Sequence, residues 1–156
     1  MKAVTVKQLK TALNNCSQSE MIELCLQLAK FKKENKELLT YVLFESDYEE
    51  GYIETVKLEI DEQFEEINTK TYYFIKKSVR KILRNIKKYI RYSKKKETEI
   101  ELLLYFCKKL KSLRPSINNN SVLKNIYLRE IASIRKKIVL LHEDLQYDYN
   151  LALNEL

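Results

Sequence analysis

Glycine, proline and tryptophan are almost absent from this chain of 156 residues. It has one glycine, Gly51, one proline, Pro115, and no tryptophan. Glycine and proline mark most tight turns, so their scarcity argues against β structure and for helices joined by short polar turns. Leu, Ile, Lys and Glu are abundant, and most of them are good or acceptable helix formers. The composition therefore predicts an all-α fold.

Patterns typical of catalytic and metal sites are also missing. His142 is the only histidine, and a zinc helix needs a second His or Cys at helical spacing. The sequence has no glycine-rich phosphate loop and no nucleophile elbow. We therefore expect no metal, no cofactor and no enzymatic activity.

The three cysteines, Cys16, Cys25 and Cys107, match no zinc or redox spacing and are odd in number. Cys25 and Cys107 lie in apolar helical stretches, which is typical of small buried thiols. No disulfide framework is implied, and this fits a reducing compartment.

Long apolar runs are missing as well. No stretch approaches the roughly 20 apolar residues of a membrane span, and residues 1–17 hold no apolar run suited to a signal peptide. We expect a soluble, cytoplasmic protein. The length predicts one domain over residues 1–156, with residues 149–156 frayed at its end.

Apolar residues recur at helical spacing along most of the chain. Ser17 and Glu20 form a capping-box pattern at the start of one helix. The last pattern is long, and a kink near His142 is compatible with it. Short turns make consecutive helices antiparallel, so we predict six to seven antiparallel helices stacked as αα-hairpins. Their approximate ranges are 4–14, 19–32, 35–45, 50–67, 71–92, 96–113 and 123–149.

A short internal similarity supports hairpins used as repeats. The stretch Glu37-Leu-Leu-Thr-Tyr41 matches Glu101-Leu-Leu-Leu-Tyr105, and each follows a lysine-rich turn. In this pattern the chain resembles HEAT-type helical repeats, and small uncharacterised all-helical bacterial proteins of that build. The resemblance implies a HEAT-like bundle or short solenoid. Because HEAT-type proteins are mainly scaffolds and binders, it favours binding over catalysis.

Charge is unevenly distributed. From Lys70 to Lys96 there are twelve Lys and Arg and no acid, whereas from Glu45 to Glu66 there are ten acids and one base. The remaining chain holds sixteen bases and twelve acids, so the asymmetry is local. The acidic stretch 45–50 lacks the glycine and terminal glutamate of a calcium loop, so we expect a solvated loop there.

The basic block is the candidate binding site. Cations fixed on a rigid helix suit phosphate groups, and interleaved tyrosines can stack on bases. We expect an acidic or anionic partner for the helix within 71–96, either nucleic acid or an acidic protein face, and consider a membrane surface the weaker option. The anion-binding candidates are Lys77, Arg80, Lys81, Arg84, Lys87, Lys88, Arg91 and Lys95, and the stacking candidates are Tyr89 and Tyr92.

Two alternatives stay open at this point. The acidic helix before the block can pack against it, with acids such as Glu54, Asp61, Glu62, Glu65 and Glu66 answering its charge. The charge blocks are then purely structural, and the protein is a protein–protein adaptor that uses the apolar hairpin of residues 21–44. The most apolar helices are richer than a small core needs, which is compatible with a homo-oligomer.

Overall fold

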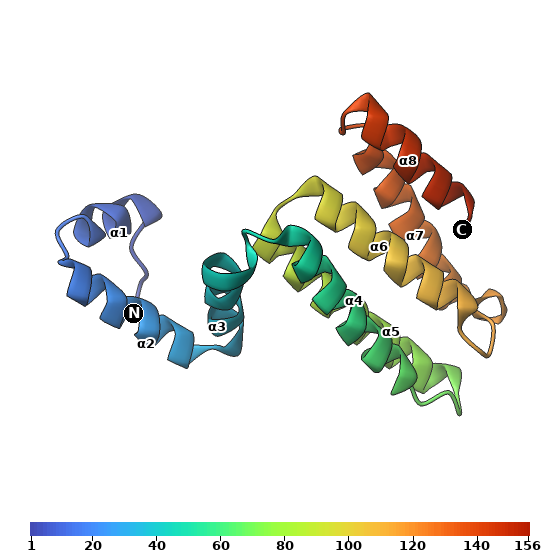
Figure 1. The fold of residues 1–156 in the computed structure, drawn as a ribbon. Coiled ribbons are helices and arrows are strands. Elements are labelled where there is room, and N and C mark those ends of the chain that lie inside the picture. Colours follow the sequence, from blue (N-terminus) through green and yellow to red (C-terminus); the bar gives the residue numbers. More distant parts are fainter. The chain divides into compact units, whose positions relative to one another are not determined.

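The computed structural model describes residues 1–156 and divides them into two compact units, Met1–Phe44 and Glu45–Leu156. The fold is all-α, as predicted, and contains no strand. It has eight α-helices, so the expected count of six to seven is wrong (Figure 1). None of these helices combines the length and apolar character needed to cross a membrane. The single domain expected from the length stays a prediction.

The extra helix comes from the long C-terminal pattern, which is divided rather than continuous. The structure has α7 (Ser121–Ile138) and α8 (Glu143–Asn154) in its place. The side chain of His142 accepts a hydrogen bond from the backbone N–H of Asp144, and two acids stand in the first turn of α8. A cap and acids at a helix N-terminus both stabilise a helix start, so the chain begins a new helix here.

Unit 1 consists of three short helices. They are α1 (Val6–Leu13), α2 (Gln18–Phe31) and α3 (Lys33–Thr40), followed by a π-helical turn, η1 (Tyr41–Glu45), that runs across the border between the units. The predicted capping box is confirmed, because Ser17 Oγ accepts from the Glu20 N–H at 3.3 Å and Glu20 accepts from the Ser17 N–H at 2.7 Å. These contacts satisfy two backbone donors that the first turn would otherwise leave unpaired.

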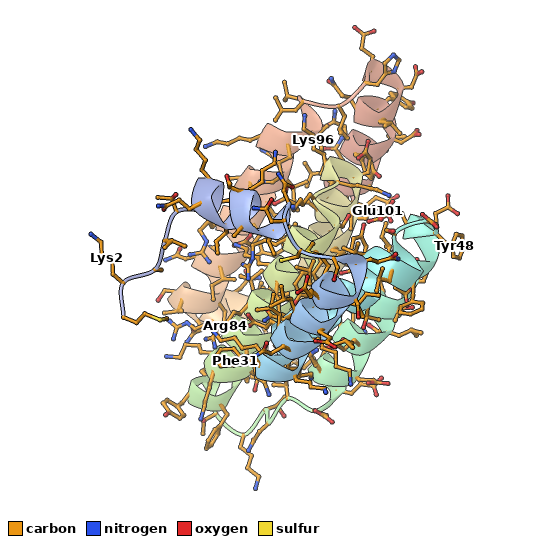
Figure 2. All side chains as sticks on the ribbon, turned by 90° about the vertical axis from the view of Figure 1, so that its left-hand side faces the viewer. Lys2, Phe31, Tyr48, Arg84, Lys96 and Glu101 are labelled. Carbon is orange, nitrogen blue, oxygen red and sulfur yellow. The ribbon has the colours of Figure 1, made fainter.

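No residue of α1, α2 or α3 is buried. On α2, Leu26 is 53% exposed and Leu28 is 58% exposed, and Phe31 at the end of α2, labelled in Figure 2, is 78% exposed. Cys25 is exposed too, so its assignment as a buried thiol is wrong. Unit 1 therefore has apolar helix faces that no core encloses.

Unit 2 holds nearly all of the core. Its helices are α4 (Glu49–Glu65), α5 (Tyr72–Ser93), α6 (Lys96–Ser112), α7 and α8, with a short 3₁₀ turn at Ile117–Asn119 before α7. Helix α6 is central, because it packs against α4, α5, α7 and α8 (Figure 1). Helix α4 also packs against α5, and α7 against α8.

The apolar pattern of the chain explains this packing. Helix α5 has an apolar stripe at helical spacing, and all its members are buried: Ile75, Val79, Ile82, Ile86 and Ile90. Helix α6 is apolar on most sides and buries Leu102, Leu103 and Phe106, as a helix with neighbours all round must. Cys107 is buried beside them, as predicted. Burial, assisted by the charge of Glu130, raises the pKa of its thiol to about 12.

The C-terminal residues contact neighbouring helices, and the fraying expected over 149–156 stays a prediction. Helix α8 continues through Asn154, and Leu153 is buried. The hydroxyl of Tyr149 donates to Glu101 at 3.1 Å, and that of Tyr127 donates to the carbonyl of Leu156 at 2.9 Å. These contacts tie the end of the chain to α6 and α7.

Candidate anion-binding groove

Helix α5 presents its cations in two rows. Positions that recur every three or four residues share one face of a helix. The groove row consists of Arg80, Arg84, Lys87 and Arg91, and the lysine row consists of Lys77, Lys81 and Lys88 of α5 together with Lys95, which lies between α5 and α6. Three of the four members of the groove row are arginines, whereas the other row has none.

The groove row faces α7 across a groove of about 480 Å³. From α7 the lining side chains are Val122, Asn125, Ile126 and Arg129, and from α5 Leu83 joins the row. Leu83 and Ile126 are buried, so they form an apolar floor. The groove therefore combines an apolar base with positively charged rims on both sides.

A buried carboxylate joins the two walls. Glu130 of α7 is 1% exposed, and its Oε2 lies 2.9 Å from Lys87 Nζ on α5. Its Oε1 accepts from Lys87 Nζ at 3.0 Å and from Arg129 Nε at 3.2 Å. A buried charge needs such partners, since an unpaired carboxylate away from water is very costly. Glu130 thus fixes Lys87 and Arg129 at the groove, while their side chains stay 45% and 66% exposed.

The three arginines of the groove row have no partner within the protein. Arg80, Arg84 and Arg91 are exposed and form no ion pair or side-chain hydrogen bond; Arg84 is labelled in Figure 2. Each guanidinium presents five N–H donors in a planar fork that matches phosphate or carboxylate oxygens. Five cations and one carboxylate leave four positive charges in excess at the groove.

The acids of α4 do not neutralise this row. Glu54 pairs with Lys57 of its own helix at 2.8 Å, and Asp61 pairs with Lys109 of α6 at 2.9 Å. None of the acids expected to answer the basic helix pairs with a cation of α5: Glu54, Asp61, Glu62, Glu65 and Glu66. The polar contacts between α4 and α5 include Gln63 with Asn85 and Glu59 with Tyr89.

The lysine row and the tyrosines lie outside the groove. Lys95 pairs with Glu49 at 2.9 Å, and Lys88 Nζ lies 4.6 Å from the centre of the Tyr89 ring. Tyr89 is half-buried and donates its hydroxyl to Glu59 at 2.7 Å, and its ring meets that of Tyr92 edge-on at 6.1 Å. Of the eight predicted cations, the groove takes the four of its row, while Lys77 and Lys81 are exposed elsewhere. Stacking on Tyr89 and Tyr92 stays a prediction.

Sequence reasoning missed the second wall of the groove. Asn125, Arg129 and Glu130 come from α7, far from the basic block in sequence. One signal was available. Glu130 stands four residues from both Ile126 and Ile134, in the middle of an apolar stripe, and a charge at such a position requires a partner.

A second hollow of about 390 Å³ contains acids. Glu50, Glu54 and Glu101 line it, but Lys57 reaches Glu54 at 2.8 Å and Glu101 at 3.4 Å. No group of three or more His, Cys, Asp or Glu side chains is arranged to hold a metal ion. Lys57 offsets one of these three acidic charges, so this hollow stays acidic, unlike the positively charged groove.

The acidic stretch 45–50 is not simply a solvated loop. Glu49 begins α4, is half-buried, and accepts hydrogen bonds from the hydroxyls of Ser93 and Thr98. With the Lys95 ion pair, these contacts fasten the start of α4 to the turn between α5 and α6.

No protein-family model, curated protein or solved structure matches this chain. Its function is therefore inferred from the geometry and charge of the groove.

Proposed function

We propose that this protein is a non-enzymatic binding module whose groove between α5 and α7 takes up the phosphate groups of a nucleic acid. The observation that supports this is the set of unpartnered arginines, Arg80, Arg84 and Arg91, in one row facing Arg129. Arginine holds phosphate oxygens with two parallel hydrogen bonds, which adds direction to the attraction of charge.

The row is long and regular, which suits a repeating anion better than a single one. Eleven residues separate Arg80 from Arg91, so the row extends over about 16.5 Å at the helical rise of 1.5 Å per residue. A nucleic-acid backbone offers charges along such a length. An acidic protein face is the competing partner and is an outcome of the test below.

The test is the affinity of the protein for labelled DNA and RNA across a salt series, measured by fluorescence anisotropy. Affinity should fall linearly with salt on logarithmic axes, with a slope that corresponds to about three to five phosphates. Removing two groove charges by Arg84→Gln with Arg91→Gln should weaken binding about tenfold or more and make the slope shallower by roughly two phosphates.

The matched control removes two charges from the same helix outside the groove, by Lys77→Gln with Lys81→Gln. It should change affinity less than about threefold, since only general attraction is reduced. Equal effects of the two pairs would assign binding to the whole basic helix. No binding to any nucleic acid at low salt would refute the proposal and favour an acidic protein partner.

We also propose that unit 2 is a short stack of helical hairpins, α4 with α5 and α6 with α7, followed by α8, similar to HEAT-type repeats. The packing of α6 against α4, α5 and α7 supports this arrangement. Such stacks build extended binding surfaces from neighbouring units, as the groove does from α5 and α7. The free thiols fit the cytoplasmic location expected from the sequence.

A second candidate function is favoured by unit 1. The α2–α3 hairpin packs together, yet Leu26, Leu28 and Phe31 of α2 are more than half exposed, as is Leu43 of the following η1. Exposed apolar surface of this kind marks protein contact sites. An adaptor using residues 21–44 would form a homo-oligomer or hold another protein. Light scattering over a wide concentration range tests self-association, which Leu26→Ser with Leu28→Ser should abolish.

A further inference from the structure

We infer that the ligand of the groove is a single strand of nucleic acid, held through about three or four consecutive phosphates, and not a duplex. This inference rests on the proposed function and assigns its substrate class. It draws on the flanks of α5, the straightness of the groove row, and the apolar floor.

Helix α5 is poorly placed to enter a DNA major groove. A recognition helix of about 10–12 Å diameter fills a major groove about 12 Å wide, so it must project from its protein. Here α5 packs against α4 and α6 and faces α7 across the groove, which leaves only an outer arc exposed. A duplex could therefore touch the rims but could not bring its bases to the groove row.

The groove row is also straight. Successive members stand four, three and four residues apart, so their Cα positions advance by about 6, 4.5 and 6 Å along α5. A strand in a duplex winds around the duplex axis, so its phosphates move away from a straight row of cations after a short stretch. An extended single strand can lie along the whole row and present one phosphate to each cation.

The floor between the rims gives the bases a place. Leu83 and Ile126 are buried and Val122 is half-buried, so the base of the groove is apolar. Unpaired bases can rest their faces on such a surface while the phosphates meet the arginines, whereas paired bases are already stacked inside a duplex. Asn125 on the rim carries both donors and acceptors for base edges.

The walls of the groove are held before any ligand arrives. Glu130 pairs with Lys87 of α5 and Arg129 of α7, so it fixes one cation on each rim. Prearranged cations lower the ordering cost of binding. No aromatic side chain lines the groove, so the bases meet only aliphatic side chains on the floor, and we expect weak sequence preference.

The experiment compares a labelled single strand with a hairpin duplex of the same composition, using the chain of 156 residues and the same series of salt concentrations for both. The single strand should bind at least about tenfold more tightly, since only it reaches the floor as well as the rims. Its logarithmic salt slope should be about −2 to −3, as expected for three or four phosphates of a single strand.

Two matched variants on α7 locate the bases. Val122→Glu places a carboxylate on the floor, whereas Leu128→Glu makes the same charge change at an exposed position outside the groove. Val122→Glu should weaken single-strand binding about tenfold or more, and Leu128→Glu less than about twofold. Circular dichroism confirms folding, and Arg84→Gln with Arg91→Gln serves as the groove variant if Val122→Glu unfolds.

The outcomes separate this inference from the proposed function. Duplex binding as tight as single-strand binding, lost with the groove arginines, would overturn the inference and leave the proposed function standing. Binding of neither nucleic acid would overturn both. Single-strand binding that Val122→Glu and Leu128→Glu weaken equally would remove the floor from the site and overturn the inference.

Discussion

Both units contain helices with apolar faces, but only unit 2 buries most of these faces. In unit 2, Leu103 is 1% exposed, because α6 has neighbours on every side. In unit 1, Leu26 lies on α2, which is also rich in apolar residues, and it is 53% exposed. A segment of 44 residues with three short helices is near the lower limit for enclosing a core of its own. The difference shows that apolar periodicity forms a helix face, but burial requires enough surrounding elements.

The largest expected difference between the units is thiol reactivity. Burial, with the nearby charge of Glu130, raises the pKa of Cys107 from 9.0 to about 12, which lowers its thiolate fraction about a thousandfold. Ellman's reagent at pH 8 should therefore label Cys16 and Cys25 of unit 1 quickly and Cys107 only after denaturation. Labelling of all three thiols at one rate would show that the core of unit 2 opens as readily as unit 1.

Truncating matched leucines should separate the units next. Leu103→Ala should lower the free energy of unfolding by about 2–5 kcal/mol, because it leaves a cavity beside α6. Leu26→Ala removes the same atoms from an exposed site and should cost less than about 1 kcal/mol. Urea denaturation followed by circular dichroism measures both. A cost for Leu26→Ala equal to that of Leu103→Ala would mean that the face of unit 1 is covered in solution.

Breaking the ion pair between Lys87 and Glu130 should have a third, smaller effect, which concerns the stability of unit 2. Lys87→Met leaves the buried Glu130 with Arg129 alone and should lower the free energy of unfolding by about 1–3 kcal/mol. Lys81→Met, on the same helix without a partner, should stay within about 0.5 kcal/mol. Adding Glu130→Leu to Lys87→Met should recover most of the loss, since no buried charge then needs a partner. No recovery would contradict this account of Glu130.

The smallest expected effect is a pH dependence at Asp61. Desolvation alone would raise the pKa of Asp61, but hydrogen bonds from Lys109 and Tyr105 outweigh it and lower the pKa below the ordinary 3.8. A carboxyl whose pKa is depressed by folding stabilises the fold above its unfolded pKa and loses that contribution as the pH falls through its folded pKa.

Asp61→Asn should therefore cost up to about 1 kcal/mol at pH 7 and nothing near pH 2, as this partly exposed pair is screened by solvent. Denaturation at both pH values measures the difference. Glu62→Gln, at the next position and without a partner, should show no loss at either pH. The same loss for Asp61→Asn at pH 2 would assign the effect to shape and not to charge.

Local features of the fold were readable from the sequence. The Ser17 cap, the buried stripe of α5 and the helix of residues 96–112 follow from interactions within a few turns. The division at His142 was harder to place, because the apolar pattern continues across it. The burial of Cys107 and the exposure of Cys25 could not be separated, since both lie in apolar stretches and differ only in what covers them.

The candidate site also has some features that the sequence predicts and others that it does not. The sequence by itself determined that α5 is a helix with one buried face and a cationic outer arc, because charge and periodicity are local properties. Only the tertiary structure decided which cations already form ion pairs within the protein. In the folded protein Lys95 pairs with Glu49 and Asp61 pairs with Lys109. Arg84 and Arg91 face α7 and have no partner. Pairing of charges depends on distances between elements, and those distances are set by the packing of the apolar faces beneath them.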